Sequence, residues 1–165
     1  MLIRALIAFL ALPGMVAGLV PLLIVGKESH LAQTAPYGIA LLFIGFLLLL
    51  WCVRDFYVSG KGTLAPWDPP KRLVLVGLYR YVRNPMYVAV LTLVAGWSLA
   101  FGSVWLGLYL CLLAVAFHLR VLRYEEPWLS RQFGADWEAY SKAVPRWLPR
   151  PSRQKPSGQK IDQST

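Results

Sequence analysis

The chain has 165 residues, of which 57% are hydrophobic and only 15% are charged, and its formal net charge is +9. A water-soluble domain of this size cannot hide that much apolar side chain, so we expect an all-α integral membrane protein. The basic residues cluster at the edges of apolar runs, as topology signals do, so the positive charge does not indicate a nucleic-acid partner.

Residues 1–58 are expected to hold a pair of transmembrane helices. Leu2 to Val25 is interrupted by prolines and glycines. Its long apolar run behind a single Arg4 is typical of a kinked span rather than a signal peptide. Lys27 to Pro36 is a short polar loop, and Tyr37 to Val53 is the second predicted span.

A connector rich in turn formers follows, and the three prolines of Ser59 to Pro70 (SGKGTLAPWDPP) exclude a helix there. It contains the pattern G-x-G-x-x-A, but a dinucleotide site needs a strand before this pattern and a helix after it, and Pro66 follows at once. A metal site is not expected, because the cysteines and histidines are isolated along the chain: Cys52, Cys111, His30 and His118.

Residues 59–150 are expected to form one module built on a helical hairpin. Pro85 to Phe101 and Val104 to Leu122 are the third and fourth predicted spans, and the two-residue link between them makes them antiparallel neighbours. Apolar residues at helical spacing then predict an amphipathic helix on the bilayer surface: Leu129, Phe133, Trp137 and Tyr140. Residues 151–165 are polar and are expected to be a disordered tail.

The charges predict the topology. Six Lys and Arg residues lie from Arg54 to Arg83, and nine more follow Leu119, whereas the loop at Lys27 has one and the turn between the last two spans has none. Four spans with both termini and the central loop in the cytoplasm satisfy the positive-inside rule. In a bacterium this membrane is the inner one, and the site described next faces the cytoplasm.

The central polar stretch, Lys71 to Tyr87 (KRLVLVGLYRYVRNPMY), carries four basic residues and three tyrosines. Asn84 followed by Pro85 is typical of a helix start, with Asn as the cap and Pro at the first helical position. A helix N-terminus flanked by Arg and Tyr can bind an anion and stack a flat ring. The alternative is a capped juxtamembrane loop with no ligand.

Glu125 and Glu126 directly follow the fourth span, at the same membrane face as that stretch. One interpretation is an ion-pair network with Arg80 and Arg83. The other is a site for a zwitterionic ligand, in which a carboxylate binds an ammonium group and Asn84 with its helix N-terminus binds a carboxylate. S-adenosyl-L-methionine has these parts and adds an aromatic ring for a tyrosine.

These motifs resemble the isoprenylcysteine carboxyl methyltransferase family and its phospholipid methyltransferase relatives. The resemblance covers about Lys71 to Pro149: GLYRYVRNPMY, a hydrophobic hairpin, EE, and FGADWEAYSKAVPRWLP. It implies a membrane methyltransferase that uses S-adenosyl-L-methionine. Carried over to this chain, the cofactor-binding residues are Lys71, Arg72, Leu73, Val74, Tyr79, Asn84, Pro85, Met86, Tyr87 and Glu125.

Two positions depart from the family pattern. Asn84 replaces the usual His, so it can hydrogen-bond a cofactor but cannot act as a base. Val121 stands where the family has a substrate-contacting Arg, and Arg120 or Arg123 beside it can serve instead. We therefore expect Arg120, Arg123 and Glu126 to act on the acceptor, with Glu126 or Tyr87 as base where one is needed.

The acceptor is expected to be lipidic, an isoprenylcysteine-like carboxylate or a phospholipid head group, because a tail can enter between spans while its head meets the cofactor. Methyl transfer mainly needs positioning and a suitable charge environment, which this small set of residues can supply. Two alternatives remain open: a membrane reductase that uses a nicotinamide cofactor, and a non-catalytic lipid-binding or scaffold protein.

Overall fold

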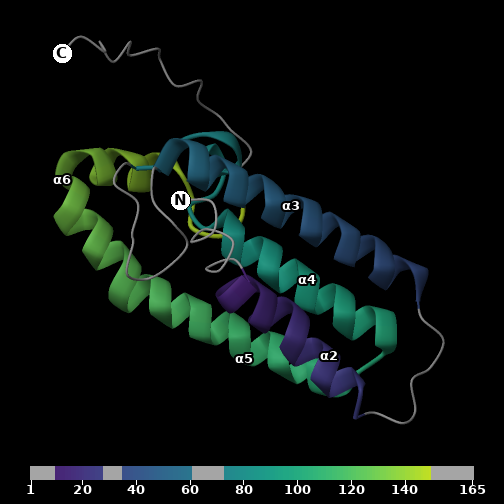
Figure 1. The fold of residues 1–165 in the computed structure, drawn as a ribbon. Coiled ribbons are helices and arrows are strands. Elements are labelled where there is room, and N and C mark those ends of the chain that lie inside the picture. Colours follow the sequence, from purple (N-terminus) through teal and green to yellow (C-terminus); the bar gives the residue numbers. More distant parts are fainter. Residues whose placement is uncertain (1–9, 28–34, 61–72, 150–165) are drawn as a thin grey trace.

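The computed structural model of the protein describes residues 10–27, 35–60 and 73–149 (Figure 1), and all regular structure in these ranges is helical. The expected all-α fold is therefore confirmed for this part of the chain. The elements in order are η1 Leu10–Leu19, α2 Val20–Val25, α3 Pro36–Gly60, η2 Gly77–Arg80, α4 Pro85–Phe101, α5 Val104–Arg120, η3 Val121–Glu125 and α6 Glu126–Ala143.

The first two predicted spans are helical where the structure describes them. The π-helix η1 contains Pro13 and runs directly into α2, so the expected first apolar segment is an irregular helix from Leu10 to Val25. Helix α3 continues past Val53 to Gly60. The part of this helix that is apolar enough to cross a membrane is Pro36–Asp55, close to the predicted span, and Asp55 at its end is buried.

Helices α3 and α4 approach each other closely through glycines. A Cβ at Gly45 would lie 2.9 Å from the backbone nitrogen of Leu93, and one at Gly96 would lie 2.7 Å from that of Leu42. Small residues at crossing points are typical of helices that pack by van der Waals contact in a membrane. The antiparallel pairing brings the end of α3 beside the start of α4.

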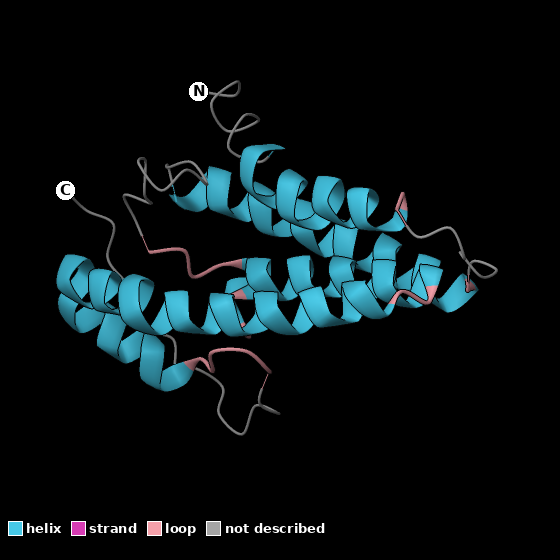
Figure 2. Ribbon diagram, turned by 90° about the horizontal axis from the view of Figure 1, so that it is seen from below, coloured by secondary structure: helices cyan, strands magenta, loops and turns pink. Residues whose placement is uncertain are grey.

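The tight turn between α4 and α5 is confirmed. Helix α4 ends at Phe101, Gly102 takes a left-handed conformation (φ 62°), and its N–H donates to the carbonyl of Ser98. The Ser103 side chain then accepts from the backbone N–H of Leu106 and caps α5. Figure 2 shows the helices aligned along one common direction, as this hairpin requires.

Helix α5 runs through η3 into α6 without a break until Gly134, whose φ of 50° and ψ of −121° are not helical. The second half of α6 therefore bends back toward the bundle (light green, left side of Figure 1). Trp137 and Tyr140 are buried against the protein. The expectation that these two residues lie on the bilayer surface is wrong, since the bend at Gly134 turns them inward.

The outer faces of the bundle are apolar. Two helical runs, Pro36–Asp55 and Val104–Ala143, are long and apolar enough to cross a membrane, and Pro13–Val25 and Pro85–Phe101 are shorter apolar helices. Most of the residues in the two long runs are not buried inside the protein, with large side chains such as Phe43, Leu47 and Leu112 exposed. Lipid is the environment that stabilises such faces.

Candidate functional site

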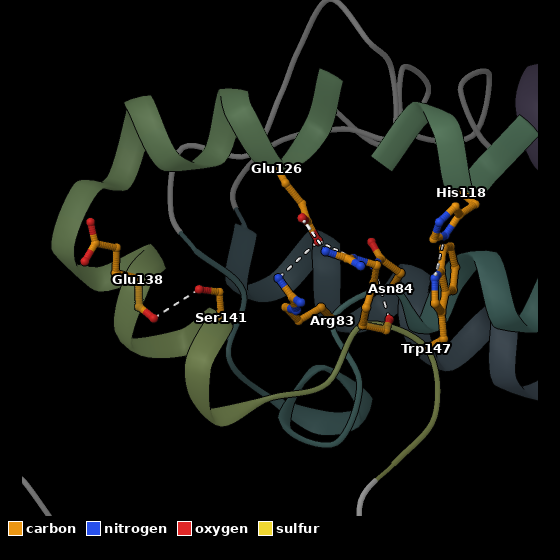
Figure 3. A network of polar contacts seen from close by, with 8 residues as sticks. Arg83, Asn84, His118, Glu126, Glu138, Ser141 and Trp147 are labelled. Carbon is orange, nitrogen blue, oxygen red and sulfur yellow. Dashed lines mark hydrogen bonds and ion pairs between the residues drawn. The ribbon is translucent and has the colours of Figure 1, made fainter. Parts of the chain in front are cut away.

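The candidate site lies where the start of α4, the end of α5 and the chain after α6 meet (Figure 3). We call residues 144–149 the C-terminal segment. The backbone N–H of Arg83 donates to the carbonyl of Pro145 at 2.8 Å. The side-chain amide of Asn84 donates to the carbonyl of Arg146 at 3.2 Å. These two bonds hold the C-terminal segment against the start of α4.

Glu126 is the centre of an ion-pair network. It accepts from Arg83 Nη1 at 3.0 Å and from Arg146 Nε and Nη2 at 2.7 and 2.8 Å. Burial lowers the pKa of Arg83 and the charge of Glu126 opposes that shift, while the hydrogen bond to Glu126 raises the pKa of Arg146. The expected pairing of the adjacent glutamates with Arg83 is confirmed for Glu126.

Arg83 is fixed on its other side by an aromatic ring. Its guanidinium carbon lies 5.6 Å from the ring centre of Trp137, within cation–π range. Arg80, which we expected in the same network, is instead exposed in η2. The network thus joins the residue before the N-cap of α4, both halves of α6 and the C-terminal segment, and it gives Trp137 a structural role.

Glu125 faces a different set of partners from its neighbour. It accepts a hydrogen bond from the Tyr87 hydroxyl and another from Arg120 Nε at 2.9 Å. The Tyr87 ring packs 4.4 Å from Phe117 and 6.4 Å from Trp147, measured between ring centres. The expectation that the Lys71–Tyr87 stretch and the glutamate pair are neighbours is confirmed by this contact.

Asn84 occupies the N-cap position of α4, as predicted, but its side chain makes no capping hydrogen bond. The prediction of a side-chain cap is therefore wrong: the amide points to Arg146 instead. The N–H groups of the first turn of α4 keep their capacity to bind an acceptor. The amide of Asn84 also keeps one N–H beyond the one it gives to Arg146.

Tyr79 lies in a second cluster, between η2 and α3. It is buried with Val74 and Cys52, and Met86 of α4 packs against them. The hydroxyl of Tyr140 donates to the backbone carbonyl of Tyr79 at 2.7 Å. Burial raises the pKa of Tyr79 well above its ordinary value, and the nearby charges, Asp55 and Glu125 among them, raise it further.

The remaining predicted residues are placed as follows. Pro85 is buried and Leu73 half-buried, while Arg120 and Arg123 are exposed. Lys71 and Arg72 lie outside the described residues.

Sequence reasoning missed several residues that the structure brings to the site. The indole N–H of Trp147 donates to Nδ1 of His118 at 3.1 Å, and Arg146 binds Glu126. Asp55 is buried beside η2. The V-P-R-W run after the last helix was the one available signal for Arg146 and Trp147, and nothing in the sequence marked His118 or Asp55.

Comparison with known proteins identifies the family. A profile described as phospholipid methyltransferase matches residues 34–136, which run from the residues just before α3 into α6. The chain belongs to the phospholipid methyltransferase family. The matched region includes Asn84, Tyr87, Glu125 and Glu126, and with the apolar helices it identifies a membrane protein of a methyltransferase family.

A curated relative of this family member is the nickel-cobalt-cadmium resistance protein NccN of Alcaligenes xylosoxydans xylosoxydans, which is 30% identical over 101 residues. The alignment covers 61% of this chain but only 43% of NccN, so the chain spans less than half the length of that relative. No solved structure matches the chain.

Proposed function

We propose that this member of the phospholipid methyltransferase family transfers a methyl group from S-adenosyl-L-methionine to a lipidic acceptor. The observation that carries the proposal is the position of Glu125. This carboxylate meets Tyr87 at the start of α4, beside Asn84 and a helix N-terminus without a side-chain cap. A hydrogen-bond acceptor for an ammonium group therefore lies close to hydrogen-bond donors for a carboxylate. A zwitterionic amino-acid group needs both.

The buried polar atoms support the fit of this cofactor. Among the described residues, two buried side-chain atoms have no hydrogen-bond partner: Asp55 Oδ2, an acceptor, and Arg83 Nε, a donor. Such atoms are costly unless a ligand satisfies them. S-adenosyl-L-methionine carries both donors and acceptors. The residues proposed to bind it are Lys71, Arg72, Leu73, Val74, Tyr79, Asn84, Pro85, Met86, Tyr87 and Glu125.

When bound, S-adenosyl-L-methionine supplies a methyl group whose bond to sulfur breaks as the acceptor atom forms its new bond in line. The chain contributes position and charge. Glu125 would hold the ammonium group, Asn84 and the first turn of α4 the carboxylate, and Tyr87 would keep Glu125 in place. Glu126 is proposed as the base for an amine acceptor, which requires that Arg146 release it.

The acceptor is proposed to be lipidic because the outer faces of α3 and α5 are apolar right up to the site. Arg120 and Arg123 are exposed near the end of that apolar surface and carry positive charge. They suit an anionic head group, either a carboxylate or a phosphate. A lipid tail against the helices would then present its head to the cofactor side of α4.

The topology belongs to the same proposal. We propose four spans, with both termini and the site in the cytoplasm, because the Lys and Arg residues are concentrated from Arg54 to Arg83 and after Leu119. The two shorter apolar helices would cross as part of the bundle, in which α4 packs against both α3 and α5.

Calorimetry on the detergent-purified protein with S-adenosylhomocysteine, the stable reaction product, tests the proposal. We expect Glu125→Gln to weaken binding by about 1.5–3 kcal/mol, the worth of a charge-assisted hydrogen bond. Glu138→Gln is the matched control, because Glu138 is exposed on α6 and the same charge is removed. The control should bind like the original protein.

Lipid mass spectrometry of cells with and without the protein should show methylated species that Glu125→Gln removes. Binding of a reduced nicotinamide nucleotide in place of S-adenosylhomocysteine would support a reductase. A protein that binds neither of these ligands would be a scaffold. Either result would contradict the proposed methyltransferase activity.

A further inference from the structure

Asp55 is a buried acid that the proposed chemistry does not yet use. It lies in the last turns of α3 and is 5% exposed. Its Oδ1 accepts from Arg54 Nη1 at 3.2 Å, while Oδ2 has no hydrogen-bond partner among the described residues. A negative charge near a helix C-terminus is unfavourable, and an unpaired buried carboxylate oxygen adds to that cost. A contribution to stability therefore does not explain why an acid is buried at this position.

The free oxygen points to the start of η2. Gly77 has a φ of 56°, and a Cβ there would overlap Asp55 Oδ2, so this glycine leaves the space that the carboxylate occupies. Cys52, one turn before Asp55, packs against Val74 and Tyr79. Asp55 therefore sits beside the stretch that carries the proposed cofactor residues, on the α3 side of it.

Tyr79 connects this carboxylate with the rest of the site. Its ring is buried in the cluster with Cys52, and Met86 in the first turn of α4 packs against the same cluster. The residue after Met86 is Tyr87, whose hydroxyl donates to Glu125. A ligand whose ammonium group is held at Glu125 can extend past Tyr79 toward Asp55.

We propose that Asp55 Oδ2 accepts hydrogen bonds from the ribose hydroxyls of the S-adenosyl cofactor and so fixes its nucleoside end. An ionised carboxylate can only accept hydrogen bonds, so it selects a ligand group that donates. Its negative charge also repels the carboxylate end of this ligand. The ammonium group has Glu125, which leaves the ribose hydroxyls as the next strong donors. This inference rests on the proposed function and adds the orientation of the cofactor.

The test compares S-adenosylhomocysteine with its 2′-deoxy and 3′-deoxy forms by calorimetry. We expect the original protein to bind the deoxy forms, or at least one of them, roughly ten- to hundredfold more weakly. Asp55→Ala should bind S-adenosylhomocysteine more weakly by a similar factor and should no longer discriminate against the deoxy forms. Arg54→Gln is the control, since it removes the partner of Oδ1 and leaves Oδ2 unchanged.

Thermal unfolding without ligand separates ligand binding from structural support. Asp55→Asn keeps the shape and removes the charge, so we expect an unchanged or higher melting temperature together with weaker binding. A lower melting temperature with full discrimination between the ligands would make Asp55 a support for Gly77 and would overturn the inference. If the original protein binds no S-adenosylhomocysteine, the proposed function fails too, whereas binding that ignores Asp55 refutes this inference alone.

Discussion

The two adjacent glutamates should respond differently to the same change. Glu126 is 18% exposed and pairs with Arg83, which is 12% exposed, and with the more accessible Arg146. Glu126→Gln would leave the buried guanidinium of Arg83 without its counter-charge. One nearly buried pair and one half-exposed pair together give an expected loss of about 2–4 kcal/mol in the free energy of unfolding.

Glu125→Gln is the matched comparison, because its partner Arg120 is 52% exposed. An exposed pair of this kind contributes about 0.5 kcal/mol, so this variant should unfold almost like the original protein. Reversible denaturant unfolding in mild detergent, followed by the fluorescence of the tryptophans, measures both losses. Equal losses, or a loss below 1 kcal/mol for Glu126→Gln, would refute the view that Glu126 holds the site together.

Two further predictions concern the fold and its orientation. Gly96→Ala places a Cβ 2.7 Å from the backbone of Leu42 and should lower the free energy of unfolding by about 1–3 kcal/mol in a denaturant titration. The control Gly107→Ala, whose Cβ would have its nearest neighbour at 3.5 Å, should be neutral or slightly stabilising. Equal effects of the two variants would contradict the close contact between α3 and α4. A cysteine replacing Ser59 should react with a membrane-impermeant reagent only from the cytoplasmic side, and labelling from the outside alone would overturn the proposed topology.

Local signals were enough to predict the hairpin and the contacts it enforces. The bounds of α4 followed from Asn84-Pro85 at one end and Gly102-Ser103 at the other, and both are as expected. Because the link between α4 and α5 has only two residues, α5 must run antiparallel to α4 and beside it. The proximity of the Lys71–Tyr87 stretch to the glutamate pair followed from that geometry, whereas the individual contact between Tyr87 and Glu125 did not.

Contacts made by the chain after η3 were not predictable in the same way. Helical spacing of Trp137 and Tyr140 defines a face but not the environment that the face meets. The bend at Gly134 determines the environment of Trp137 and Tyr140. A glycine within a helical pattern does not by itself predict a positive φ. The burial of Asp55 was not predictable for a related reason, since an acid after an apolar run marks the end of the span but does not show what its side chain contacts.

The C-terminal segment has a consequence for how the protein is made. Asn84 and its partner Arg146 are 62 residues apart in the chain, and Arg83 must likewise wait for Pro145. In the proposed four-span topology, all four apolar helices would therefore be synthesised before Glu126 can meet Arg146 and before Asn84 can meet its backbone partner. Insertion of the helices and completion of this site would then be separate events in the synthesis of the protein.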